Sequence, residues 1–245
     1  PKAPEQESYP LTPSQQRLWI LSQLEGGSQA YNMPAVVTLR GELNEAYFEK
    51  AFQYLIGRHE ILRTSFKSEK AMGEIRQYIT PKEEVHFTIE VLDFSGKNES
   101  EIEDYLQAAN NEAFSLEESP LIRATLLKRG NEEHLFFLSM HHIIGDGWST
   151  EVLVSEVVEN YNNLLNGNTK ENKRGLQYNE SLCRSSGAYS VDLRSLMYHI
   201  SLNLRCHRLF LKSAITLYTS KKEKTLRTGS LVGDLTHKAG TPRDK

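Results

Sequence analysis

The segment 135–149 constrains the fold most, because it contains a strand, a tight loop and the start of a helix in direct succession. Residues Leu135–Met140 are almost all apolar, as expected of a buried strand, and HHIIGDGWS follows. A helix with a regular apolar face begins immediately afterwards. Gly145 and Gly147 flank Asp146 and permit backbone angles that other residues avoid. The segment therefore predicts a sharp loop that presents side chains at the end of a strand.

Residues 1–170 mix predicted helices with paired strands. Helices are expected over 14–24, 45–57, 101–114 and 151–165, capped by Ser14, by Asn44, by Ser100 and by Ser149 or Thr150. Strands are expected over 34–40, 61–66, 74–80, 85–91, 121–128 and 134–140, with a hairpin through 70–73. This order predicts an α/β fold, built as an α+β layered sandwich that is large enough to bury a core.

The apolar periodicity also predicts which side chains face that core. In the first helix we expect an inward face of Leu18, Leu21 and Ile20 or Leu24. In the second helix the expected set is Phe48, Ala51, Phe52, Leu55 and Ile56. In the last helix it is Val152, Val157, Tyr161, Leu164 and Leu165.

The composition is that of an ordinary globular protein. The 245 residues are 38% hydrophobic and 25% charged, with a net charge of −3, which excludes collagen, a coiled coil and a disordered tail as descriptions of the whole chain. No apolar run is long enough to span a membrane, and the first residues do not resemble a signal peptide, so we expect a cytoplasmic protein. Two cysteines are too few for a disulfide framework.

The charge is distributed unevenly along the chain. Residues 1–170 hold 15 Lys and Arg against 26 Asp and Glu, a net charge of −11, whereas 171–245 hold 14 against 6, a net charge of +8. Such a basic segment can be a nucleic-acid arm, but this one has no capping or turn signals that agree with its apolar positions. We therefore predict one domain over 1–170 and an atypical basic tail over 171–245 that is frameshifted or disordered, and we do not expect a nucleic-acid partner.

His142 is the candidate base, because an imidazole at the mouth of a loop can take up a proton near neutral pH. Asp146 could orient that imidazole, as in a triad, or turn away and pair with an arginine. His59, His86 and His134 have no supporting motif, and we expect them to be ordinary structural residues. The sequence contains no third metal ligand at a suitable spacing, no GxSxG elbow and no phosphate loop, which argues against a metal site, a serine hydrolase and nucleotide chemistry.

Four segments together resemble the condensation domains of nonribosomal peptide synthetases, in the superfamily of chloramphenicol acetyltransferase. His141–Gly147 matches the HHxxxDG signature, and Tyr9–Trp19 and Arg58–Phe66 are similar to the first and second motifs of the family. Phe114–Arg123 resembles the segment that precedes the central strands. All four lie in the expected order, and all belong to the N-terminal half of the family's two-part, V-shaped domain.

The resemblance implies a chloramphenicol acetyltransferase-like half-domain and acyl transfer that forms an amide bond between two carrier-bound aminoacyl or peptidyl thioesters, a step in the biosynthesis of secondary metabolites. No cofactor or metal would bind directly, because phosphopantetheine arrives on the partner carrier proteins. The implied partners are peptidyl or acyl carrier proteins and adenylation domains, without a membrane.

The same resemblance assigns roles to individual residues. His142 would face the reaction channel and either accept the amine proton or stabilise the zwitterionic adduct. His141 would pack against the loop, and Gly147 would close it. Asp146 would be structural, forming a salt bridge with Arg58, with Arg63 as the alternative partner.

Resemblance to the family ends near Leu176–Tyr178, and the second half of the domain does not follow. We hypothesise a reading-frame shift close to 177–179, which sequencing of the coding DNA would test. The chain is then a fragment, and we predict no condensation activity from it alone. The alternatives are a noncatalytic carrier-docking or interaction fragment and an epimerisation-type domain, which shares the histidine motif.

Overall fold

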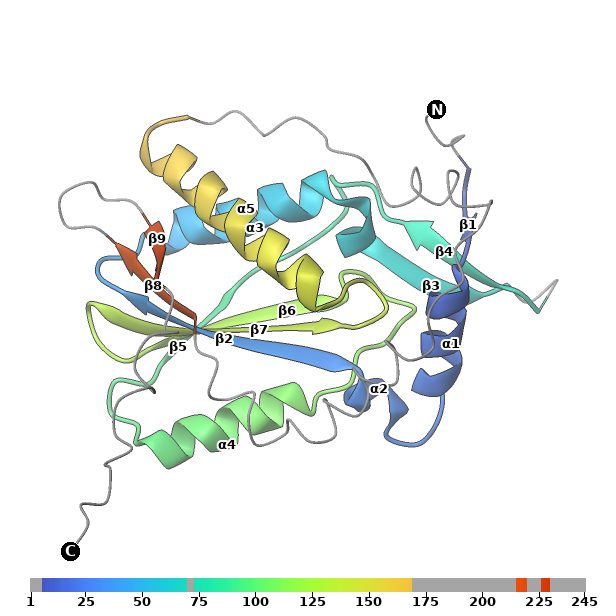
Figure 1. The fold of residues 1–245 in the computed structure, drawn as a ribbon, viewed down its shortest axis with the longest axis horizontal. Coiled ribbons are helices and arrows are strands. Elements are labelled where there is room, and N and C mark those ends of the chain that lie inside the picture. The colour runs from blue at the N-terminus through green and yellow to red at the C-terminus, as the bar shows by residue number, and fades with distance from the viewer. Residues whose placement is uncertain (1–5, 70–72, 169–214, 220–225, 230–245) are drawn as a thin grey trace, which may run out of the picture.

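The computed structural model describes residues 6–69, 73–168, 215–219 and 226–229 (Figure 1). Its helices are α1 (Pro13–Ser22), α2 (Gly27–Ala30), α3 (Glu45–Arg58), α4 (Glu99–Asn110) and α5 (Gly147–Leu165), with a 3-10 helix η1 (Glu60–Arg63). Its strands are β1 (Tyr9–Pro10), β2 (Asn32–Arg40), β3 (Thr64–Ser68), β4 (Ile75–Ile79), β5 (Glu90–Asp93), β6 (Ile122–Lys128), β7 (Glu133–His141), β8 (Ile215–Thr219) and β9 (Leu226–Gly229). The predicted layered α/β fold is confirmed.

A six-stranded sheet in the order β5-β6-β7-β2-β8-β9 forms the centre, with α3 and α5 on one face and α4 on the other (Figure 1). Strand β7 pairs antiparallel with both β6 and β2. Alternate residues of a strand point to opposite faces. Accordingly, Phe136 belongs to the cluster that includes the side chains of α3 and α5, whereas Phe137 belongs to the cluster formed with α4. Helices on both faces explain why β7 is apolar at nearly every position from Leu135 to Met140.

A second sheet has three strands in the order β1-β4-β3 and lies beside α1 (Figure 1). Strands β3 and β4 are antiparallel and form the hairpin expected around 70–73, of which residues 70–72 lie outside the described part of the chain. The expected strand over 61–66 begins only at Thr64, because Glu60–Arg63 forms the 3-10 helix. The expected strand over 85–91 is likewise displaced, and β5 starts at Glu90.

The packing of α3 follows the sequence pattern. All five residues expected on its inward face are buried, and the Asn44 side chain caps it by accepting a hydrogen bond from the Tyr47 amide. The ring of Phe48 lies edge-on to Phe136, with 5.0 Å between centroids, and 6.0 Å from the ring of Tyr161 on α5. Phe48 therefore joins α3 to both the sheet and α5.

The starts of α1 and α4 differ from the sequence prediction. Thr12 rather than Ser14 caps α1, because Pro13 occupies the first turn and Gln15 completes a reciprocal pair of hydrogen bonds with Thr12. Asn98 rather than Ser100 caps α4 through the same arrangement with Glu101. In each case an earlier polar side chain satisfies the free amides, so the helix begins sooner.

The inward faces of α1 and α5 also need correction. Either Ile20 or Leu24 was expected on the inward face of the first helix, but both are exposed, at 57% and 61%, and Leu24 lies beyond the end of α1. The polar side chains of Gln15 and Ser22 are buried instead. On α5, Val152 is exposed and Leu153 is buried in its place. In α1 the inward side therefore carries groups that form hydrogen bonds, which hydrophobic periodicity alone cannot reveal.

Most of the predicted tail over 171–245 lies outside the described residues, so its frameshifted or disordered character stays a prediction. Two short strands of this stretch are described: β8 lies parallel to β2, and β9 pairs antiparallel with β8. Among the described residues, no helix combines the length and apolar character needed to cross a membrane.

The packing of Phe48 yields a stability prediction. Truncating its 2% exposed ring in Phe48→Ala leaves a cavity between α3, the sheet and α5, and we expect a loss of about 3–5 kcal/mol in the free energy of unfolding. Urea unfolding followed by circular dichroism measures this. The matched control is Tyr47→Ala on the exposed side of α3, expected to change stability by about 0.5 kcal/mol or less. Equal losses in the two variants would contradict the described core.

Candidate functional site

The histidine loop joins the end of β7 to the start of α5 and is tied to β2 by the backbone. His141 lies opposite Asn32 at the last register position of the β2–β7 pair. One residue further, the His142 amide donates to the Tyr31 carbonyl at 2.9 Å, and the Ile144 amide donates to the His141 carbonyl at 3.1 Å. The loop therefore turns sharply straight after the sheet, as the sequence predicted.

His141 and His142 point to different environments, as expected of neighbours on an extended stretch. The ring of His141 is completely buried, and its Nδ1 accepts a hydrogen bond from the Ile143 amide at 3.1 Å. Burial, with a smaller effect from the neighbouring His142, lowers the pKa of His141 to about 4. The ring is therefore neutral at neutral pH and contacts its own loop.

His142 is half-buried, and its ring has a defined hydrogen-bond partner. Its Nδ1 lies 2.7 Å from the carbonyl oxygen of Gly145. A carbonyl only accepts, so Nδ1 carries the proton and donates it. In the neutral ring Nε2 then keeps a lone pair, which is the state a general base requires. The group that orients the imidazole is thus a backbone carbonyl and not the Asp146 carboxylate.

Asp146 caps α5, although the sequence pointed to Ser149 or Thr150. Its Oδ1 accepts hydrogen bonds from the Ser149 amide at 2.8 Å and the Ser149 hydroxyl at 2.7 Å. Partial burial opposes ionisation, but these two hydrogen bonds and the nearby His142 outweigh it and hold the pKa of Asp146 below its ordinary value. Asp146 is therefore the N-cap of α5.

The expected salt bridge between Asp146 and Arg58, or its alternative with Arg63, is not formed in this structure. Arg58 lies 3.5 Å from the Glu156 carboxylate. Arg63 lies near Glu60 and donates to the Thr80 carbonyl. Asp146 instead accepts from the amide and hydroxyl of Ser149 at the start of α5, while both arginines contact groups elsewhere.

Glu156 is a residue that the sequence analysis missed. From α5 it contacts both Arg58 and His59, whose Nε2 lies 2.8 Å from the same carboxylate oxygen. It therefore ties the middle of α5 to the end of α3. Glu156 lies three residues after the buried Leu153, at the edge of the inward face of α5. This helical spacing was the sequence signal that could have placed Glu156 near α3.

The two glycines of the motif do not need special backbone angles here. Neither Gly145 nor Gly147 has a positive φ. A Cβ on Gly147 would meet nothing within 4 Å, and one on Gly145 would make ordinary contacts with Met140 and Ser149 at 3.4 Å. The expectation that these glycines permit unusual angles is therefore wrong, and Gly147 is simply the first residue of α5.

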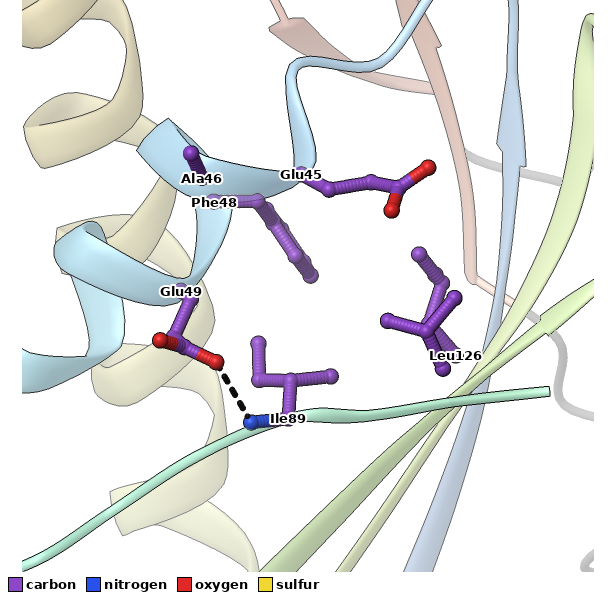
Figure 2. Close-up of a pocket in the computed structure, with 7 residues that line it drawn as sticks. Glu45, Ala46, Phe48, Glu49, Ile89 and Leu126 are labelled. Carbon is purple, nitrogen blue, oxygen red and sulfur yellow. Dashed lines mark hydrogen bonds between the residues drawn. The ribbon is translucent and has the colours of Figure 1, made fainter.

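A hollow of about 210 Å³ lies between α3 and the edge of the central sheet (Figure 2). Glu45 and Glu49 lie beside a floor that includes Phe48, Ile89 and Leu126. Both carboxylates are engaged, Glu49 by the Ile89 amide at 2.9 Å and Glu45 by Lys128. None of its lining residues comes from the histidine loop. Across the described ranges, no group of three His, Cys, Asp or Glu residues is placed to hold a metal ion.

Comparison with known families identifies the chain. The family model "Condensation domain" matches residues 5–186. The chain belongs to the condensation domain family. The recognition made from the four motifs is confirmed, and His141–Gly147 lies within the matched range.

Curated relatives are much longer peptide synthases. A plipastatin synthase protein of Bacillus subtilis (strain 168) is 42% identical over 161 residues, which are 66% of this chain and 4% of that protein. Tyrocidine synthase 3 of Brevibacillus parabrevis is 42% identical over 154 residues, 62% of this chain and 2% of that protein. The chain therefore spans only a small part of the proteins it matches.

Solved structures show the same fold. The starter condensation domain of rhizomide synthetase RzmA matches with a TM-score of 0.65 at 23% identity, covering 82% of this chain and 48% of that chain. The first condensation domain of the CDA synthetase matches with a TM-score of 0.60 at 21% identity, covering 68% of this chain and 41% of that chain. The predicted half-domain of the chloramphenicol acetyltransferase-like fold is confirmed, and this condensation domain spans about half of the solved ones.

The cap at Asp146 yields a prediction that separates a capping role from an ion pair. Asn is as good an N-cap as Asp, so Asp146→Asn should unfold with nearly the free energy of the wild type, whereas Asp146→Ala should lose about 1 kcal/mol. Urea unfolding of both variants measures this. If Asp146 paired with an arginine instead, the neutral Asn would cost as much as Ala.

The buried imidazole yields a pH prediction. Because the folded pKa of His141 is about 4, below the ordinary 6.5, the unfolded chain binds this proton more readily. The contribution of neutral His141 is present above pH 6.5 and is lost as the pH falls toward 4. Over this window the free energy of unfolding should fall by up to about 3 kcal/mol more in the wild type than in His141→Gln.

Urea unfolding at several pH values measures that difference. His134, whose pKa burial also lowers, is present in both proteins and cancels in the comparison. The exposed His86, changed to Gln, is the matched control and should leave the wild-type slope unchanged. Parallel pH profiles for the wild type and His141→Gln would show that His141 is not buried in its neutral form.

Proposed function

We propose that this condensation domain contributes the catalytic histidine to amide-bond formation in nonribosomal peptide synthesis. The observation that carries the proposal is the geometry of His142, whose Nδ1 is held by the Gly145 carbonyl at 2.7 Å, so that Nε2 is left with its lone pair. Membership of the family and similarity to peptide synthases support the reaction class.

In the proposed reaction, the amine of an aminoacyl thioester on a downstream carrier protein attacks the carbonyl carbon of an upstream aminoacyl or peptidyl thioester. The C–N bond forms, the C–S bond breaks, and the phosphopantetheine thiolate leaves. Nε2 of His142 accepts the proton that the attacking nitrogen loses, or stabilises the zwitterionic adduct before that transfer. Holding the two carrier-bound groups together supplies a large part of the acceleration.

The surrounding residues support His142 without touching substrate in this scheme. The cap formed by Asp146 and Ser149 fixes where α5 begins, and α5 closes the loop that contains Gly145. Glu156 holds α5 against the end of α3 through Arg58 and His59. No protein-bound cofactor takes part, since phosphopantetheine arrives on the carrier proteins, which together with adenylation domains are the proposed partners.

We also propose that this chain forms only part of the complete catalytic site. Because it spans 48% of a solved condensation domain, we propose that it supplies one half of the site and needs the second half for turnover. If the chain alone bound a carrier protein without turnover, the result would agree both with a half-site and with a noncatalytic docking fragment. Activity after addition of a second half separates these two functions.

The test uses residues 6–168 in place of the equivalent half of an active condensation domain, with loaded carrier proteins and mass spectrometry of the released peptide. We expect peptide formation by this chimera and none by the chain alone. His142→Ala in the chimera should lower the rate by about a hundredfold to ten-thousandfold, the usual contribution of a general base.

The matched control is His86→Ala, which removes an exposed imidazole outside the loop and should leave the rate unchanged. A chimera that makes peptide equally well with His142→Ala would refute the role of His142. A folded chimera that binds carrier proteins without making peptide would favour the docking fragment, and racemised rather than extended products would favour an epimerisation-type domain.

A further inference from the structure

The buried side of α1 contains a hydroxyl that contacts the histidine loop. Ser22 is 9% exposed, and its Oγ donates to the Leu18 carbonyl at 2.7 Å. The same oxygen lies 3.4 Å from Nε2 of His141, although 119 positions separate the two residues. A hydroxyl has one proton, and since that proton is directed to Leu18, Ser22 accepts from His141.

The opposite side of the His141 ring leads to the same protonation state. Its Nδ1 receives the Ile143 amide proton at 3.1 Å, and an amide can only donate. Nδ1 must therefore be unprotonated and Nε2 protonated. Two independent partners, one on α1 and one in the loop, thus select the same neutral tautomer.

Aromatic neighbours restrict the ring further. Tyr31 lies 6.2 Å from His141 between ring centroids, and Phe114 lies 6.3 Å away in an edge-on arrangement. Arg123 in turn covers the Phe114 ring at 4.0 Å. The orientation of His141 is thereby set by residues from several elements, while Ser22 supplies its side-chain hydrogen-bond acceptor.

The turn that contains His142 is hydrogen-bonded to the His141 ring. Ile143, the donor to His141, is the next residue after His142, and Gly145, the acceptor for His142, lies two residues later. We propose that Ser22 is a positioning residue for His142: through the His141 ring it fixes the turn that leaves Nε2 of His142 unprotonated. The inference rests on the proposed function only for the catalytic use of that nitrogen.

Nitrogen-15 NMR of the imidazole rings tests the inference in the full 245-residue chain without any activity assay. In the wild type we expect the proton on Nε2 of His141 and on Nδ1 of His142. In Ser22→Ala the His141 ring loses its hydrogen-bond acceptor and no longer fixes the turn. The nitrogen-15 chemical shifts of the two ring nitrogens of His142 should then move toward each other, because the two tautomers mix. Ser22→Thr keeps the hydroxyl and should retain the wild-type spectrum.

The matched control is Ser14→Ala, which removes an exposed hydroxyl from the same helix and should leave both rings unchanged. An unchanged His142 spectrum in folded Ser22→Ala would overturn the proposal. A spectrum of the wild type or of Ser22→Thr that places the His141 proton on Nδ1 would also overturn it. This second measurement does not depend on whether Ser22→Ala folds. Failure of the chimera to make peptide would contradict the proposed function and leave these tautomers unaffected.

Discussion

The antiparallel pairing of β2 with β7 is the interaction on which the rest of the site depends. It runs from Arg40 opposite Glu133 to Asn32 opposite His141, and it places the end of β7 beside Tyr31. The next hydrogen bond, from the His142 amide to the Tyr31 carbonyl, continues the pairing into the loop. Because a shift of one residue would exchange the two faces of β7, this register decides which histidine is buried and which is accessible.

Much of this arrangement could be predicted from the sequence, because it depends on apolar patterning. The inward face of α3 was predicted residue by residue, and the apolar run of β7 correctly indicated a buried strand. The family resemblance, rather than the apolar patterning, implied different environments for His141 and His142. The motif order identified the family, since four matches in sequence are far more specific than one.

The features that escaped prediction are polar and depend on tertiary contacts. The partner of Asp146 could not be chosen from sequence, because an arginine and the free amides of a helix are equally suitable donors to a carboxylate when only the order of residues is known. In the structure the partner is Ser149, three residues further along the chain. The inward Ser22 of α1 and the Glu156 contact with Arg58 were missed for the same reason: apolar periodicity does not register a buried hydrogen bond or ion pair.

The acceptor that orients His142 is a main-chain oxygen, that of Gly145. Replacing side chains one at a time cannot delete it, so a systematic alanine scan would pass over the group that selects the tautomer. A backbone ester between residues 145 and 146 would weaken this carbonyl as an acceptor while leaving every side chain in place. In this family member, the protonation pattern of the His142 ring therefore depends in part on the path of the polypeptide, which substitutions reach only indirectly.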